Sequence, residues 1–259
     1  MYATTASNAT TSSFACYYDK ARRTFLGDVY SIKWMEDSDK ENIEKETLDQ
    51  QYSVVKKETN TSTVCRFGDL GMGKLKVGEF QGPKENVGTK PPPYPYPHPS
   101  AGCGASAVPG PEVPVRILEK TIQDAETAEE RLEAQQRLEI LRSNRKFMED
   151  VVWRVITGVT GDEELTQTVV SDNVELTRYK HILLRTHNVV FLIFVLFRYD
   201  CYYTAVDAFH AKCFNVGRND YALRMLNAFV NLCESGFEQE DITSAIQKNC
   251  VHPQMYGIH

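Results

Sequence analysis

Cysteine and histidine are the residues that could build a nucleophilic catalytic site in this chain of 259 residues. Such a site needs a nucleophile, a base within hydrogen-bonding distance and a group that orients the base. Cys16 is one candidate thiol, but all six histidines lie at position 98 or later. A pair of Cys16 with a histidine would therefore have to form between distant parts of the chain, and an ordinary buried thiol is the favoured interpretation. The residues taken alone contain no catalytic set and indicate no cofactor.

Patterns typical of metal or phosphate binding are also missing from the sequence. Near the C-terminus, four cysteines are separated by 12, 20 and 17 residues, without the C-x2-C spacing of zinc sites: Cys201, Cys213, Cys233 and Cys250. Their clustering favours disulfides over a metal site, with the pairing left open. The glycines in residues 67–74 do not follow a strand and open a helix, as a phosphate-binding loop requires, so we expect a hairpin turn there.

Charge and hydropathy narrow the classes of partner. The net charge is −6 at pH 7, so no broad basic surface for nucleic acid is expected. The strongest apolar run has nine residues, 189–197, whereas a membrane-spanning helix needs about twenty, and we expect no membrane span. Asn8 and Asn60 begin glycosylation sequons, which together with the cysteines are typical of a secreted protein. Since the start of the sequence lacks signal-peptide features, we expect the chain to lack its N-terminal part.

The prolines divide the chain into three segments, because ten of the eleven lie between Pro83 and Pro114. The run 90–100 cannot form a helix, since proline lacks an N–H donor. A semi-rigid tether is favoured there, and a polyproline ligand for an aromatic groove is the alternative. The first segment, 1–82, has α/β character. Its expected elements are strands at 2–6, 14–18 and within 65–80, a short apolar segment at 29–34 and a helix at about 40–57.

The last segment, 115–259, is predicted to be helical. No proline or glycine occurs from Val115 to Ile156, and apolar residues recur there at helical spacing, which predicts helix throughout. Gly158 and Gly161 are expected to end it. Further helices are expected at about 163–170, 202–212, 220–233 and 242–248, with Asp162, Asn219 and Asp241 capping the first, third and fourth.

Several short sequences resemble one known family, in that family's order. Tyr2–Ala6, Ser12–Asp19 and Trp34–Asp39 look like the second half of the peptidase domain of legumains, the asparaginyl endopeptidases of lysosomes and vacuoles. Lys212–Asn215 and Val230–Cys233 resemble the C-terminal prodomain of the same family. The resemblance implies α/β plus all-α architecture. Its parts would be the C-terminal portion of a caspase-like peptidase domain at 1–82, a proline-rich linker at 83–114 and a death-domain-like helical prodomain at 115–259. It also implies a lysosome or vacuole location reached through the secretory pathway.

The resemblance further implies roles for individual residues. Asp28 matches the aspartate of the family's S1 pocket, where a carboxylate would accept the amide hydrogens of a substrate asparagine. Ser12 and Ser13 match the strand that lines this pocket and pairs with the substrate backbone. The implied disulfides are Cys201–Cys233 and Cys213–Cys250. Without the resemblance, Asp28 would be interpreted as a turn residue after Gly27.

The departures from the family are also informative. The family's catalytic cysteine and histidine precede the part that matches this sequence, so we expect no catalytic residue in this chain and no hydrolysis by it alone. The family is cut after asparagine at its activation junction, but residues 121–126 contain none. Asp124, which a legumain-type site accepts at acid pH, and Glu126 are the candidate cleavage positions. Residues 180–200 have no counterpart in the family, and we expect a retained intron or a gene-model error.

These features favour a truncated legumain-type cysteine endopeptidase precursor with an autoinhibitory prodomain. The family activity is hydrolysis of peptide bonds after Asn, and after Asp at acid pH. The expected partners are Asn-containing peptide or protein substrates and the chain's own or a partner legumain peptidase domain. The alternative is a non-catalytic module that inhibits an intact partner peptidase by occupying its active site. A helical adaptor with a proline-rich ligand segment is a third interpretation.

Overall fold

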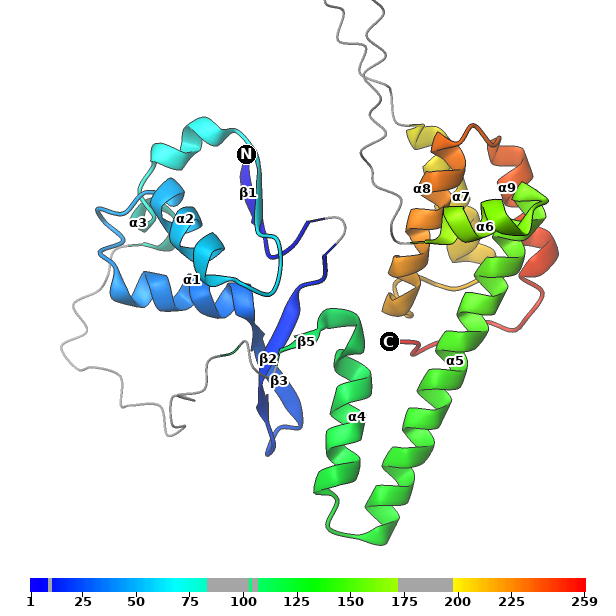
Figure 1. Cartoon of the computed structure of the whole chain (residues 1–259), viewed down its shortest axis with the longest axis horizontal. Coiled ribbons are helices and arrows are strands. Elements are labelled where there is room, and N and C mark those ends of the chain that lie inside the picture. The colour runs from blue at the N-terminus through cyan, green and yellow to red at the C-terminus, as the bar shows by residue number, and fades with distance from the viewer. Residues whose placement is uncertain (9–10, 83–102, 104–106, 172–197) are drawn as a thin grey trace, which may run out of the picture. The chain divides into compact units, whose positions relative to one another are not determined.

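The computed structural model describes residues 1–8, 11–82, 103, 107–171 and 198–259, which form two compact units, 1–135 and 136–259 (Figure 1). Most of the regular structure is helical, and two small antiparallel sheets lie in unit 1. The predicted combination of α/β and helical parts is confirmed at this level. The predicted segment boundaries at 82/83 and 114/115 stay predictions. Both the run 90–100 and the apolar run 189–197 lie outside the described residues. Among the described helices, none is long and apolar enough to cross a membrane.

The two sheets of unit 1 are short and antiparallel. In the first, β1 (Tyr2–Thr5) pairs with β4 (Cys65–Gly68). In the second, β2 (Phe14–Asp19) lies between β3 (Thr24–Asp28) and β5 (Val108–Pro109). Aromatic and β-branched residues in β1 and β2 suit a pleated, half-buried surface. Strand β5 comes from the segment that the sequence assigned to the linker, so β2 has a partner that was not expected.

The first two helices of unit 1 begin at side-chain caps. Helix α1 (Val29–Lys40) starts where the Asp28 carboxylate accepts a hydrogen bond from the Ser31 N–H. The expected short apolar segment at 29–34 is therefore the first half of a helix. Helix α2 (Leu48–Glu58) starts at a capping box formed by Thr47 and Gln50, later than the predicted start at about 40. The remaining part of 65–80 is a 3-10 helix (Leu70–Lys74) and α3 (Gly78–Gln81) in place of a hairpin turn.

The predicted continuous helix from 115 to 156 is interrupted. After a 3-10 turn (Gly110–Glu112), α4 runs over Val113–Asp124 and α5 over Ala128–Thr160. Ala125 between them has an extended backbone, with φ −60° and ψ 125°. The Thr127 hydroxyl accepts a hydrogen bond from the Glu130 N–H at 3.1 Å and so restarts the helix. Helix α5 passes through Gly158 and ends before Gly161, whose φ of +67° suits glycine.

The described residues of unit 2 form the rest of α5 and four further α-helices. These are α6 (Glu163–Val170), α7 (Tyr199–Lys212), α8 (Leu226–Glu234) and α9 (Gln239–Asn249), with a 3-10 helix (Asp220–Met225) before α8. Asp162 caps α6 through the Leu165 N–H at 2.7 Å, as predicted. The predicted cap at Asp241 is wrong, because this residue lies inside α9. Asn219 does stand at the N-cap position of the 3-10 helix, but its buried side chain makes no cap hydrogen bond and donates to the Asn215 and Met255 carbonyls.

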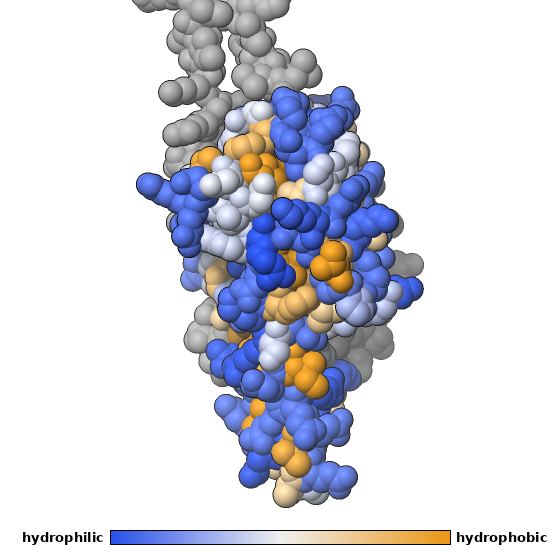
Figure 2. All heavy atoms as spheres, turned by 90° about the vertical axis from the view of Figure 1, so that its right-hand side faces the viewer, coloured by the Kyte–Doolittle hydropathy of each residue, from blue (hydrophilic) through white to orange (hydrophobic). Residues whose placement is uncertain are grey.

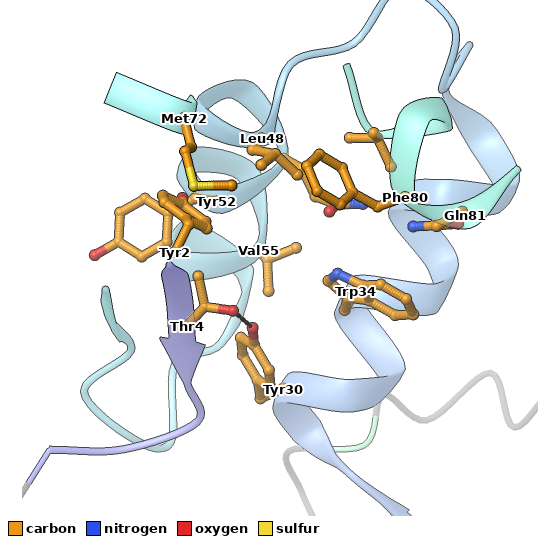
Figure 3. Close-up of a pocket in the computed structure, with 12 residues that line it drawn as sticks. Tyr2, Thr4, Tyr30, Trp34, Leu48, Tyr52, Val55, Met72, Phe80 and Gln81 are labelled. Atoms are coloured by element: carbon orange, nitrogen blue, oxygen red, sulfur yellow. Dashed lines mark hydrogen bonds between the residues drawn. The ribbon is translucent and has the colours of Figure 1, made fainter. Parts of the chain in front are cut away.

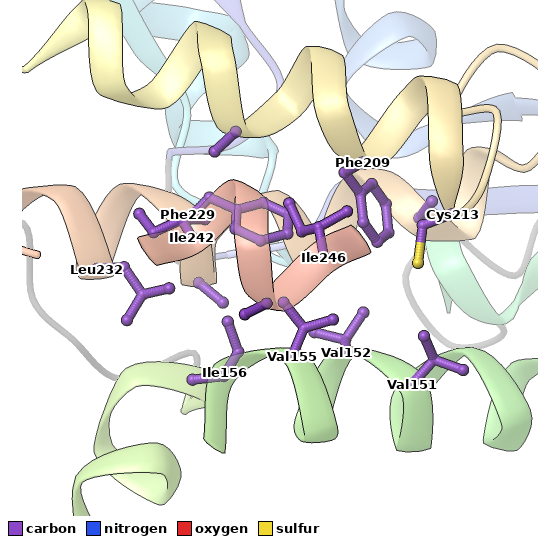
Figure 4. Close-up of a cluster of buried hydrophobic side chains, with 14 of the residues drawn as sticks. Val151, Val152, Val155, Ile156, Phe209, Cys213, Phe229, Leu232, Ile242 and Ile246 are labelled. Carbon is purple, nitrogen blue, oxygen red and sulfur yellow. The ribbon is translucent and has the colours of Figure 1, made fainter. Parts of the chain in front are cut away.

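The core of unit 2 joins four helices around one apolar cluster (Figure 4). Side chains from α5, α7, α8 and α9 point toward one another and are fully or almost fully buried: Val152, Val155, Ile156, Phe209, Phe229, Leu232, Ile242 and Ile246. Two disulfides border this core, Cys201–Cys233 between α7 and α8 and Cys213–Cys250 after α7 and α9. This is the pairing that the resemblance implied. The surface drawn in Figure 2 is mainly hydrophilic with small, separate apolar areas, which is ordinary for a protein surface.

Candidate substrate-binding site

Asp28 occupies the junction between β3 and α1. One carboxylate oxygen accepts from the Ser31 N–H at 2.9 Å, and the other accepts from the Ser31 hydroxyl at 2.8 Å. In the ladder between β2 and β3, Asp28 lies opposite Ala15. The carboxylate is half-buried and held in one orientation by the helix that it caps. Helix N-termini favour negative charge, so an acidic residue is well placed to cap α1.

Ser12 and Ser13 immediately precede β2. This strand lies between β3, which ends at Asp28, and β5. Ser12 is exposed, whereas the Ser13 carbonyl accepts a hydrogen bond from the Gly110 N–H at 2.9 Å. The ladder continues with Phe14 opposite Pro109 and Ala15 opposite Val108. The edge of β2 is thus already paired with another part of the same chain. Sequence reasoning missed this contact.

Cys16 is not the buried thiol that the sequence suggested, because it forms a disulfide with Cys103. The two Cα atoms are 5.4 Å apart, and both residues are buried with Val29, against partly buried Phe14 and Ala107. Pairing of β5 with β2 brings these cysteines together across 87 positions of the sequence. The signal for this disulfide in the sequence was the number of cysteines. Three disulfides use six of the seven and leave Cys65 free.

An aromatic cavity of about 200 Å³ lies elsewhere in unit 1 (Figure 3). Tyr2 and Thr4 of β1, Tyr30 and Trp34 of α1 and Tyr52 of α2 line it, with further residues from α2, the 3-10 helix and α3. The Tyr30 hydroxyl is hydrogen-bonded to Thr4, and burial raises the pKa of Tyr30. This lining can hold an apolar group, but it places no nucleophile next to a base.

Two buried carboxyl groups interact beside α1. Asp37, on α1, and Glu46, just before α2, are 5% and 8% exposed. Burial and the charge of Asp37 raise the pKa of Glu46 to about 7, and burial also raises the pKa of Asp37. Two neighbouring carboxylates cannot both ionise without repulsion, so this pair retains a proton in acid solution. Neither residue belongs to the predicted site.

Comparisons with known proteins match both units to one family. Residues 1–83 match the Peptidase C13 family, and residues 193–250 match the legumain prodomain. Legumain of Bos taurus is 35% identical over 252 residues, covering 96% of this chain and 52% of that protein. The chain belongs to the legumain family. Hemoglobinase of Schistosoma mansoni is 30% identical over 253 residues, which cover 96% of this chain and 52% of that protein. Vacuolar-processing enzyme of Vicia sativa is 26% identical over 272 residues, which cover 96% of this chain and 50% of that protein. The chain spans about half the length of these curated relatives.

The predicted activation positions of this legumain-family chain fall at the turn between α4 and α5. Asp124 is the last residue of α4, and its carboxylate lies 3.1 Å from the Lys20 ammonium group. Glu126 lies in the turn with an exposed side chain, and its N–H donates to the Glu130 carboxylate at 3.3 Å. The peptide bonds after both residues are outside regular helix, as access by a peptidase requires.

The two sequons differ in their surroundings. Asn60 is exposed just after α2. Asn8 is half-buried, and its side-chain oxygen accepts from the Thr11 N–H at 2.7 Å and from the Thr11 hydroxyl at 2.8 Å. A bulky glycan needs a surface position, so the surroundings favour Asn60 over Asn8 as a glycosylation site.

Proposed function

We propose that this chain is part of a cysteine endopeptidase precursor that hydrolyses peptide bonds after asparagine, and after aspartate at acid pH. The observation that carries the proposal is Asp28, a fixed carboxylate at the end of β3, across β2 from the edge strand. In the complete enzyme, a thiolate would attack the carbonyl carbon after asparagine and a histidine would protonate the leaving amine. Both of those groups would belong to the part of the legumain relatives that this sequence does not match.

Asp28 suits the recognition of a neutral amide. A carboxylate offers about four lone-pair sites, and the two bonds from Ser31 use two of them. The remaining sites can accept the amide hydrogens of an asparagine side chain. An apolar side chain would leave this acceptor unpaired at a cost of about 1–3 kcal/mol, which gives selectivity for asparagine.

The test is a chimera in which the unmatched N-terminal part of bovine legumain precedes Met1. We expect it to hydrolyse Asn-containing peptides after acid treatment, and the 259-residue chain alone to hydrolyse none. Asp28→Asn should lower kcat/KM by about 10- to 100-fold, because it replaces an acceptor with an amide. Asp39→Asn, on the exposed end of α1, is the matched control and should leave kcat/KM unchanged. Equal activity of Asp28→Asn and the unmodified chimera would overturn the proposal.

Autoinhibition is the second part of the proposed function. The helical unit acts as a death-domain-like prodomain that covers the active site until acid pH protonates carboxylates. The match of residues 193–250 to the legumain prodomain supports this. A lysosomal or vacuolar location follows from the same acid activation.

We place the activation cut after Asp124. Protonation of Asp124 weakens its ion pair with Lys20 and makes the side chain resemble an amide. Mass spectrometry of the acid-treated chimera should show a fragment ending at residue 124, and Asp124→Ala should suppress it. A first cut at another position would contradict this assignment, and a first cut after Glu126 would move it within the same turn.

An inhibitory module is the second candidate function. The specific observation behind it is that unit 2 closes its own apolar core and has two disulfides, so it carries what a separate folded inhibitor requires. Titration of active bovine legumain with the 259-residue chain separates the functions. Dose-dependent inhibition supports this candidate, and unchanged activity at excess chain excludes it.

A further inference from the structure

Residues 107–110 are held on the edge of β2 by hydrogen bonds and by a covalent link. The N–H of Gly110 donates to the Ser13 carbonyl at 2.9 Å, and Val108 and Pro109 lie opposite Ala15 and Phe14. The covalent link is the Cys16–Cys103 disulfide, which joins the interior of β2 to a residue just before this segment. Both half-cystines are buried, at 0% and 3% exposure.

The contacts on the C-terminal side of this segment depend on α4. Lys120 lies with its ammonium group 4.8 Å from the centre of the Tyr18 ring of β2, and Asp124 pairs with Lys20. A cut after Asp124 separates α4 from α5 and from everything that follows. The disulfide is unaffected by such a cut, because both half-cystines lie before it.

The disulfide also shortens the tether that precedes the segment. In the sequence, Val108 follows Cys103 by five residues and follows Gln81, the last residue of α3, by 27 residues. Closing a shorter loop of sequence costs less chain entropy. The disulfide therefore favours occupancy of the β2 edge over attachment through the chain alone.

We propose that the Cys16–Cys103 disulfide is a lock that keeps residues 107–110 on the substrate edge of β2 after the chain is cut between α4 and α5. The functional role of this disulfide rests on the proposed function, in which Ser12 and Ser13 present this edge to the substrate backbone. The edge of β2 then stays occupied after the part of the chain beyond the cut has been removed. Opening requires a dithiol reductant, which becomes a disulfide as it gives two electrons and two protons to Cys16 and Cys103.

The test uses the 259-residue chain with the recognition sequence of a site-specific protease in place of residues 125–127. Hydrogen exchange of the Gly110 amide, whose N–H bonds to Ser13, reports occupancy of the edge. In the disulfide-bonded protein, we expect cutting to change this exchange rate by less than about threefold. In the cut Cys103→Ser variant, exchange should be faster by about tenfold or more.

Cys65→Ser removes the free cysteine of β4 and is the matched control, with exchange like that of the unmodified chain. Trp34 fluorescence establishes that each variant is folded in unit 1, and reduction of the cut protein with a dithiol supplies the same comparison without a substitution. Equal exchange in the cut disulfide-bonded protein and in cut Cys103→Ser overturns the lock, as does an unpaired Cys16 in the non-reduced mass map. Neither readout needs catalysis. If the disulfide retains residues 107–110 on β2 after cutting, but Asp28→Asn leaves the chimera fully active, then only the proposed function is wrong.

Discussion

Units 1 and 2 are stabilised in different ways. Unit 2 buries one continuous apolar cluster, most of it from α5, α7, α8 and α9, and two disulfides link residues in or at the ends of α7, α8 and α9. Unit 1 has two small sheets and a second buried cluster built around Cys16, Val29 and Cys103. The larger shared core makes unit 2 the more self-sufficient part, since buried apolar area is the main source of stability.

The buried polar groups sharpen this contrast. Among the described residues, the buried side-chain oxygens of Thr59 and Thr61 have no hydrogen-bond partner within the protein, and the carboxyl pair Asp37–Glu46 is also in unit 1. Unit 2 has no such unpartnered side-chain atom among its described residues. Each buried group without a partner costs about 1–3 kcal/mol, so unit 1 should be the less stable and the more dependent on solution conditions.

The largest predicted effect tests whether the core of unit 2 stabilises that unit alone. Phe229→Ala removes a fully buried ring from α8 and should lower the unfolding free energy of unit 2 by about 3–5 kcal/mol. Urea unfolding followed by the two tryptophans separates the units, since Trp34 lies in unit 1 and Trp153 in unit 2. The Trp153 transition should move and the Trp34 transition should not.

Leu223→Ala, at a position that is 55% exposed in the same unit, is the control and should shift neither transition. A joint shift of the Trp34 and Trp153 transitions in Phe229→Ala would show that the units unfold together, and it would remove the basis of the comparison.

The second prediction concerns pH and unit 1. The pKa of Glu46 is raised to about 7 and that of Asp37 is also raised, so between about pH 4.5 and 7 the folded state binds more protons than the unfolded state. Stability is therefore fully present in acid and is lost as the pH rises through this window, by up to about 1.4 kcal/mol per pH unit for one proton. The Trp34 transition should move to lower urea concentration from pH 4.5 to 7.

Glu46→Gln isolates the cause of this pH dependence. Glutamine resembles the protonated carboxyl group, so the variant should match the unmodified chain at pH 4.5 and exceed its stability at pH 7. The charges of Glu41 and Glu58 also raise the pKa of Asp37, so a weaker pH dependence should remain in the variant. Exposed Glu44→Gln is the control. A Trp34 transition that is equally stable at both pH values would contradict the role of the carboxyl pair.

The contrast between the units also explains which features the sequence could predict. The α6 cap at Asp162 was predictable because donor and acceptor are three residues apart. Asn219 also precedes a helix, but its side chain donates hydrogen bonds to the carbonyl groups of residues 215 and 255, which no local sequence pattern indicates. The Cys16–Cys103 disulfide and the β2–β5 ladder depend on contacts between distant positions, so spacing rules could not predict them. Asp28 was assigned to the S1 pocket from the resemblance alone, and its role as a helix cap emerged only from the structure.

The smallest effect separates the two roles of Asp28. Asp28→Ala removes the cap of α1 and should lower the stability of unit 1 by about 1 kcal/mol, seen as a shift of the Trp34 transition only. Asp28→Asn should leave that transition in place, because asparagine caps helices about as well as aspartate. The two variants should nevertheless both impair cleavage of Asn-containing peptides in the chimera. If cleavage falls only in Asp28→Ala, the carboxylate acts through the helix cap, and substrate recognition has to be assigned to other residues.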